Sequence, residues 1–129
     1  MGKGPKAWSM KKGKDFWGPP TWVTFHSFAA TFKPGKERAF KLFLEVVLPE
    51  LMPCENCAAN LLEKIQRFPP DPYLTNNDNA FFYSYLIHDL ANQHITRYHP
   101  DKPKVSPPYD DVKSRYFRAL GQECKDCKV

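Results

Sequence analysis

Thirteen prolines interrupt this chain of 129 residues, and the stretches between them carry apolar residues three and four positions apart. That spacing is the period of an amphipathic helix, and proline favours helix ends because it removes a backbone hydrogen bond from a helix interior. We therefore predict helices over residues 20–32, 36–48, 54–68, 79–93 and 109–120. No stretch alternates as a strand does and none repeats, so the predicted fold class is all-α: a four-helix bundle with a short fifth helix.

Apolar stripes on these helices supply the predicted core. We interpret the many phenylalanines as packing residues, because an apolar stripe at helical spacing is usually core. The stripes are Trp22, Phe25, Phe28, Ala29 and Phe32 in the first helix, Ala39, Phe40, Phe43, Leu44 and Val47 in the second, Cys54, Cys57, Ala58, Leu61, Leu62 and Ile65 in the third, and Phe81, Phe82, Tyr85, Leu86 and His88 in the fourth.

Length and charge define the organisation of the chain and the class of its partner. With 42% hydrophobic residues, the chain can form one domain with a real core but is too short for two. We predict a flexible basic N-terminal tail over 1–13, one domain over 14–120 and a C-terminal tail over 121–129. The net charge of +5 favours an anionic partner: nucleic acid, an acidic membrane surface or a phosphate-bearing cofactor. The N-terminal lysines are typical of a solvated tail, so they do not predict a nucleic-acid partner.

The sequence predicts no membrane span. No apolar run reaches the roughly 18 residues that a span needs, and the N-terminus lacks the hydrophobic segment of a secretory signal. We expect a soluble protein outside the classical secretory pathway.

The four cysteines form two CxxC pairs. Cys54 and Cys57 open the third predicted helix, where a spacing of three brings both sulfurs to one side, within reach of a disulfide. The positive end of the helix dipole lowers a thiol pKa there, and Pro53 fixes the entry to the helix. Cys124 and Cys127 lie near the C-terminus, each followed by a lysine, Lys125 and Lys128, whose charge also favours the thiolate.

Three interpretations of the cysteines follow from the residues alone. Two CxxC pairs can hold zinc, but zinc ribbons usually separate their pairs by roughly 15 to 20 residues, whereas most of the domain separates these. A redox function is favoured over zinc, and structural or inert thiols are the third interpretation. The zinc interpretation carries its own function: a zinc-stabilised, basic helical module that binds nucleic acid or a protein partner.

Two further residue pairs could line a slot beside the helix that begins at the cysteines. Trp22 and His26 are four apart on the first helix, and His88 and Asn92 are four apart on the fourth. Each pair therefore projects from one face of its helix. Taken singly, a helical tryptophan or histidine is more often core or surface than ligand.

Three motifs in order and spacing carry a resemblance to a known family. The segments WGPPTWVTFHSFAATF, MPCENCAANL and HDLANQ resemble the Erv/augmenter-of-liver-regeneration family of FAD-linked sulfhydryl oxidases. The family pattern is a W-x3-H-x2-A helix, a CxxC that opens a later helix, and an H-N-x-x-N motif. The short chain and the segment KVSPPYDDVKSRYF look more like the versions carried by large DNA viruses than like cellular ones.

The resemblance implies roles for individual residues. Cys54 and Cys57 match the proximal redox pair, with Cys57 beside the flavin ring and Cys54 as the exchange thiol. The predicted FAD-binding residues are Lys14, Gly18, Trp22, His26, Cys57, His88, Asn92, Lys104 and Tyr116, with Phe117 as the alternative to Tyr116.

The chain also departs from the family pattern. Asp89 stands where the family usually has asparagine, so the contact made by that amide is altered. With four cysteines, the chain cannot carry both two redox pairs and the extra structural disulfide of many cellular relatives. The resemblance therefore implies that Cys124 and Cys127 are a shuttle pair, which in this family can serve the partner subunit of a homodimer.

The resemblance implies an enzyme that uses FAD. Electrons pass from dithiol protein substrates through the CxxC pairs and the flavin to O2, which yields hydrogen peroxide. Disulfide formation in a reducing compartment suits a virus that assembles its proteins at sites in the host cytoplasm, or an enzyme carried in the virion. The mitochondrial intermembrane space is the alternative location.

Overall fold

The computed structural model describes residues 11–121, and this part of the chain is helical and has no strand. The α-helices are α2 (Lys14–Ala30), α3 (Glu37–Leu42), α4 (Leu48–Leu51), α5 (Glu55–Arg67), α6 (Asn77–Tyr98) and α7 (Tyr109–Leu120). A π-helical segment, η1 (Phe43–Val47), joins α3 to α4, and a 3-10 turn, η2 (Asp71–Tyr73), precedes α6. The prediction of an all-α fold is confirmed.

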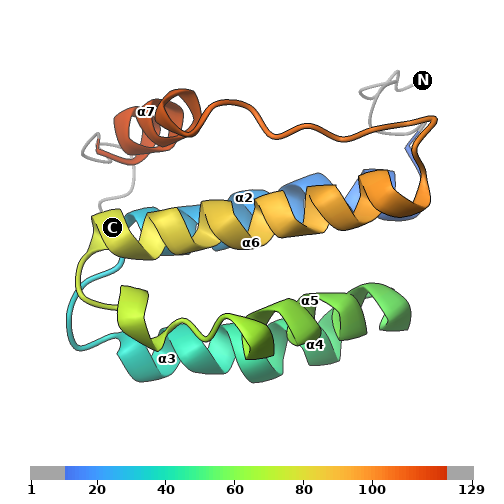
Figure 1. Ribbon diagram of the computed structural model, residues 1–129. Helices are drawn as coiled ribbons and strands as arrows, with labels where there is room; N and C mark the ends of the chain where they lie inside the picture. Colours follow the sequence, from blue (N-terminus) through green and yellow to red (C-terminus); the bar gives the residue numbers. More distant parts are fainter. Residues whose placement is uncertain (1–10, 122–129) are drawn as a thin grey trace, which may run out of the picture.

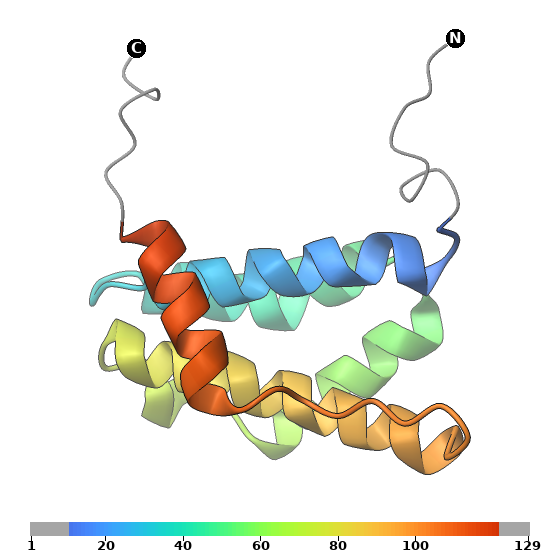
Figure 2. The ribbon, with the colours of Figure 1, turned by 90° about the horizontal axis from the view of Figure 1, so that it is seen from above.

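The helices lie in layers around a central pair. In Figure 1, α2 and α6 lie side by side, with α5 and the continuous α3–η1–α4 stretch on one side of them and α7 on the other. Figure 2 shows α7 crossing above α2 and α6, and the connector from 99 to 108 running along α6. This arrangement leaves α2 and α6 in contact with both outer layers.

The first helix starts earlier than predicted. We expected a start at or near Pro20, but α2 begins at Lys14 and contains Pro19 and Pro20. Gly13, at φ 55°, turns the chain into the helix, and its carbonyl accepts hydrogen bonds from the amides of the next turn. Both prolines are exposed, so water can take the place of the amide protons that they lack. The additional turn brings Lys14 to the site described below.

The second helix runs past its predicted end. The helical path continues from Glu37 through η1 to Leu51, with Pro49 inside its last turn. In η1 the amide of Leu48 donates to the carbonyl of Phe43, five residues back. This wider turn inserts one residue into the helix.

The other helices follow the predictions more closely. Cys54 is the N-cap of α5, and Asn76 caps α6, where its side chain accepts from the amide of Asn79 at 2.8 Å. The predicted fourth helix was too short at both ends, because α6 spans Asn77–Tyr98. α7 has the predicted bounds and ends before Gly121.

The core lies between α2, α6 and their neighbours. Phe25, Phe81 and Tyr83 are fully buried, and the Tyr83 hydroxyl donates to the carbonyl of Phe68. Four predicted core residues are instead exposed: Phe28 (48%), Val47 (44%), Phe82 (43%) and Ala39. Their stripes are wider than the surface that the neighbouring helices cover, so the outer edge of each stripe remains at the surface.

The connector before α7 is fastened to α6 by side chains. The Tyr85 hydroxyl donates to the carbonyl of Pro107, and Thr96 exchanges hydrogen bonds with the backbone of Lys104. Within residues 11–121, no helix is long and apolar enough to cross a membrane.

Candidate active site

The Cys54–Cys57 pair forms a disulfide at the start of α5, with the two Cα atoms 5.2 Å apart. The Cys57 amide donates to the Cys54 sulfur at 3.1 Å, which makes Cys54 the side-chain cap of the helix. A thiolate on Cys54 would keep this donor and the positive end of the helix dipole. The position therefore favours Cys54 as a leaving group in thiol–disulfide exchange.

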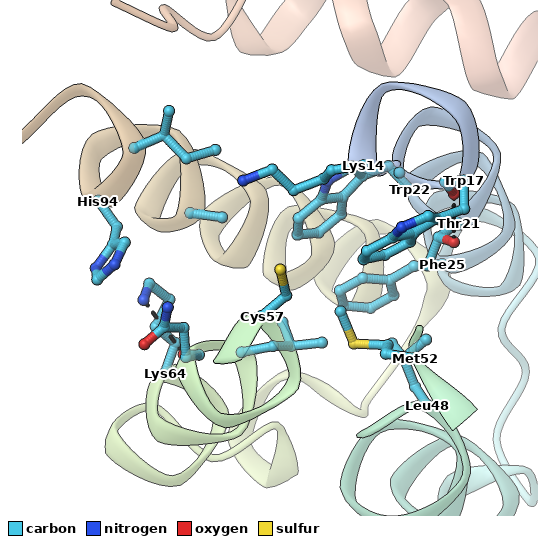
Figure 3. A pocket seen from close by; sticks show the side chains of 15 residues that line it. Lys14, Trp17, Thr21, Trp22, Phe25, Leu48, Met52, Cys57, Lys64 and His94 are labelled. Carbon is cyan, nitrogen blue, oxygen red and sulfur yellow. Dashed lines mark hydrogen bonds between the residues drawn. The ribbon is translucent and has the colours of Figure 1, made fainter. Parts of the chain in front are cut away.

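Cys57 opens onto a small apolar cavity of about 120 Å³, here called the cysteine cavity. In Figure 3 the Cys57 sulfur points toward Lys14, with Trp22 and Phe25 on one side and Lys64 and His94 on the other. The wall carries no carboxylate among the described residues. It suits a flat, apolar ligand that gains negative charge.

A second, larger cavity of about 710 Å³ lies between α2, α6 and α7. We call it the basic cavity, because its wall carries one carboxylate, Asp15, and several basic side chains. The two cavities share wall residues, so one elongated ligand could span both. The basic side chains are Lys11, Lys12, Lys14, Lys104 and Arg115, and the shared residues are Lys14, Gly18, Trp22 and Ile95.

Two histidines in the wall of the basic cavity form a hydrogen-bonded pair. Ser84 donates to the carbonyl of Phe81, so the Ser84 hydroxyl accepts from His26 Nδ1 at 2.8 Å. His26 Nε2 then accepts from His88 Nδ1 at 2.9 Å. This order of donors requires a neutral His26, and a neutral His88 then keeps a lone pair on Nε2.

Burial keeps both rings neutral. It lowers the pKa of His26 to about 3 with help from the charges of His88 and Arg115, and that of His88 to about 4 with help from Lys104. The Trp22 ring stacks on His88 at 3.9 Å between centroids, with 6° between the planes. The stack forms a flat wall between the two cavities.

A polar cluster fixes the far wall of the basic cavity. The Asn92 amide donates to the Ser106 hydroxyl at 2.9 Å, and Ser106 donates to Asp89 at 2.8 Å. Asp89 also accepts from Gln93. Asp89, which departs from the family pattern, thus holds the connector against α6 and does not line either cavity.

The structure brings the predicted cofactor-binding residues together. All of them line one cavity or both: Cys57 lines the cysteine cavity, Lys14, Gly18 and Trp22 line both, and His26, His88, Asn92, Lys104 and Tyr116 line the basic cavity. Phe117, the alternative to Tyr116, packs edge-on against Phe81 instead. Cys124 and Cys127 lie outside the described residues.

Sequence reasoning missed several wall residues. Arg115 lies directly before Tyr116 and lines the basic cavity, and Lys64 and His94 line the cysteine cavity. Lys64 follows Cys57 by seven residues, two helical turns, which is a signal that the sequence contained. The positions of Arg115 and His94 depend on packing between helices.

Comparison with protein families agrees with this geometry. The model of the Erv1/Alr family matches residues 19–116, most of the chain, and this span includes the Cys54–Cys57 disulfide and most of the residues that line the two cavities. The chain belongs to the Erv1/Alr family. Members of the Erv1/Alr family are in general FAD-linked sulfhydryl oxidases. A comparison with curated proteins finds no match.

The two cavities fit the cofactor of the Erv1/Alr family. The cysteine cavity offers an apolar slot beside a disulfide, as a flavin ring requires, and the basic cavity offers the cations and stacking rings that a pyrophosphate and a nucleobase require. Within residues 11–121, no group of three or more potential metal ligands comes together. The zinc interpretation also requires Cys124 and Cys127, which lie outside these residues.

Proposed function

We propose that this protein is a FAD-dependent thiol oxidase that forms disulfide bonds in dithiol protein substrates. The observation that carries the proposal is the Cys54–Cys57 disulfide, whose Cys57 end lines an apolar cavity suited to a planar ring. In the overall reaction two substrate thiols become a disulfide and O2 becomes hydrogen peroxide. Two electrons and two protons pass from the thiols to oxygen, so the reaction balances without another reactant.

Cys54 and Cys57 have different roles in this proposal. An incoming thiolate attacks the Cys54 sulfur, forms a mixed disulfide and releases Cys57 as a thiolate in the cysteine cavity. A second thiol then attacks the mixed disulfide and releases Cys54, whose thiolate is stabilised by the Cys57 amide at 3.1 Å. Cys54 and Cys57 are then both reduced, and their disulfide forms again as the pair gives up two electrons, for which FAD, when bound, would supply the acceptor that passes them to oxygen.

Other side chains hold the cofactor in this proposal. The Trp22–His88 stack offers a flat surface to aromatic rings, and Lys104 and Arg115 offer positive charge to phosphates. The neutral His88 offers an acceptor nitrogen to a donor such as an exocyclic amine. His26, which also lines the basic cavity, orients that ring and is itself held by Ser84.

The experiment that tests the proposal is a visible absorption spectrum of the purified protein, followed by addition of dithiothreitol in air. We expect a yellow protein that consumes oxygen and produces peroxide. A colourless protein that stays inactive after FAD is supplied would overturn the proposal. Release of zinc on thiol modification would then favour the metal-binding module.

Cys124 and Cys127 are proposed as the shuttle pair that carries electrons from protein substrates to Cys54. The proposal rests on the family resemblance and on their CxxC spacing. Cys124→Ser should slow oxidation of protein substrates and spare small dithiols, which reach Cys54 directly. Equal rates on a reduced protein substrate for the variant and the parent would exclude the shuttle role.

We also propose that the protein is a homodimer. Phe28 meets Phe43 edge to face at 5.0 Å between centroids, and Val46 and Val47 are exposed on the same helical stretch as Phe43. Exposed apolar residues gathered in this way favour association. Phe28→Asp should convert a dimer to a monomer in sedimentation, whereas Phe82→Asp, at another exposed phenylalanine, should not. A parent protein that sediments as a monomer would exclude the dimer.

The origin and location are proposed from the sequence resemblance. We propose that the chain is a short viral version of the family that works at assembly sites in the host cytoplasm or in the virion, with the mitochondrial intermembrane space as the alternative. Microscopy of the tagged protein in infected cells distinguishes the two. Signal confined to mitochondria would overturn the first.

A further inference from the structure

Lys64 is a buried lysine on the same face of α5 as Cys57. The two residues are seven apart, or two helical turns, and both line the cysteine cavity. Lys64 is 4% exposed, whereas Lys14, the other lysine in this wall, is at the surface. Figure 3 shows Lys64 at one end of the cavity, near His94.

The Lys64 ammonium has no anionic partner within residues 11–121. It donates to the Asn60 carbonyl at 3.2 Å, and no carboxylate oxygen of this part of the chain lies within 4.0 Å of it. The neighbouring Glu63 pairs with Arg67 instead. Burial lowers the pKa of Lys64, which reflects the cost of holding this charge away from water.

An uncompensated buried cation lowers the stability of a folded protein unless a negative charge enters beside it. The proposed function supplies that charge, because each catalytic cycle brings two electrons into the cysteine cavity. The cavity wall contains no carboxylate among the described residues, so nothing there opposes the arrival of the electrons. A cation close by stabilises the reduced state over the oxidised state.

We propose that Lys64 is the counter-charge of the cysteine cavity, and that it makes the flavin bound there easier to reduce. This inference rests on the proposed function and deepens it. Lys64 acts by its charge on the electron-accepting group, and Cys54 and Cys57 carry out the covalent exchange. The positive charge must therefore be kept, whereas the exact shape of its side chain is less important.

The test is the midpoint potential of the FAD-loaded protein, measured by equilibrium reduction and followed by flavin absorbance. Lys64→Met should lower the equilibrium constant for reduction of the flavin by about tenfold to hundredfold. For two electrons, this corresponds to a fall in the midpoint potential of about 30 to 60 mV. Lys64→Gln should give a similar fall, and Lys64→Arg should retain most of the parent potential. The control is Lys33→Met, which removes an exposed lysine. Lys33 follows the C-terminal end of α2, whereas Lys14 at the N-terminal end lines the cavity, so this variant should not change the midpoint potential.

Thermal unfolding of the oxidised protein gives a second readout. Since Lys64→Met removes a buried unpaired charge, it should leave the oxidised protein as stable as the parent or more stable. A residue with only a packing role would instead lower the midpoint temperature and leave the potential unchanged.

The outcomes separate this inference from the proposed function. If the parent takes up no FAD, the proposed function fails and this inference fails with it. If the parent binds FAD and oxidises dithiols but Lys64→Met and Lys64→Gln keep its potential, only the role of Lys64 is overturned. An equal fall in Lys33→Met would also overturn it, because the effect would then come from net charge.

Discussion

The cysteine cavity and the basic cavity share a wall but differ in the chemistry of their linings. The cysteine cavity is small, apolar and bounded by a disulfide, with one buried cation. The basic cavity is larger and is lined by lysines, an arginine and a pair of neutral histidines. This difference indicates that electron transfer and FAD affinity can be altered separately. Substitutions in the cysteine cavity should affect electron transfer, and substitutions in the basic cavity should affect cofactor binding.

Cys57→Ser gives the largest expected effect and the sharpest test of that separation. We expect oxidation of dithiothreitol to fall by at least about a hundredfold, because the disulfide can no longer form. FAD should remain bound, because the basic cavity is unchanged. Oxygen consumption and the flavin absorption of the purified variant measure the two effects. Oxidation at the parent rate would show that Cys57 is not the proximal thiol.

Trp22→Ala should be an exception to this separation, because Trp22 lines both cavities. Loss of a stacking aromatic costs about 1 to 3 kcal/mol, so FAD affinity should fall by about tenfold to hundredfold. Titration of the flavin-free protein with FAD measures it. Phe82→Ala, which removes an exposed aromatic residue that lines neither cavity and lies outside the proposed dimer surface, is the matched control. Unchanged affinity in Trp22→Ala would place the flavin elsewhere.

Arg115→Met should affect the basic cavity alone. A charge-assisted hydrogen bond to phosphate contributes about 1.5 to 3 kcal/mol, so FAD affinity should fall by about tenfold or more. The weakening should shrink at high salt, and the dithiol oxidation rate of the FAD-saturated variant should match that of the parent. Arg118→Met on the same helix, outside both cavities, should bind FAD normally. Slower dithiol oxidation by Arg115→Met at saturating FAD would show that the basic cavity also affects electron transfer, and would contradict the separate roles of the two cavities.

The histidine pair affects the stability of the folded protein instead of electron transfer or cofactor binding. His26 and His88 have pKa values of about 3 and about 4 in the folded protein against 6.5 in an unfolded chain. Between pH 6.5 and about 4 the unfolded chain binds more protons, so the free energy of unfolding should fall by about a few kcal/mol as the pH falls. Denaturant titrations of the flavin-free protein across this range measure the slope.

The matched variants are His26→Gln and His99→Gln. His26→Gln should reduce the pH slope, because it removes one of the two buried groups that must be protonated. His99 is exposed, so His99→Gln should keep the parent slope. Parent and His26→Gln proteins with the same slope would mean that the buried pair does not control acid stability.

Much of the fold and part of the site could be predicted from sequence, because helix periods and caps are local. The start of α5 at the cysteines and the end of α7 at Gly121 follow from such signals. The start of α2 at Lys14 could not be predicted, because a pair of prolines usually marks a boundary and here lies on an exposed face inside the helix. The exposure of Phe28 depends on which neighbours cover α2, which no local pattern records.

The site shows the same limit. His88 and Asn92 were found through a short motif, and both line the basic cavity. Arg115 was missed because α7 crosses the α2–α6 pair at an angle that its own residues do not determine (Figure 2). Lys64 was overlooked because a lysine in an amphipathic helix is expected to face solvent.

The π-helical segment has a consequence for how this chain tolerates changes in length. η1 inserts one residue between α3 and α4, and Leu48 and Met52, which line the cysteine cavity, follow it. Deleting one residue from this turn would restore a regular α-helix and leave the helix on either side in its present orientation, because the wider turn already accommodates the extra residue. A one-codon deletion here should therefore do less damage than one inside the uninterrupted helix α5, where it would rotate Lys64 by about 100° against Cys57.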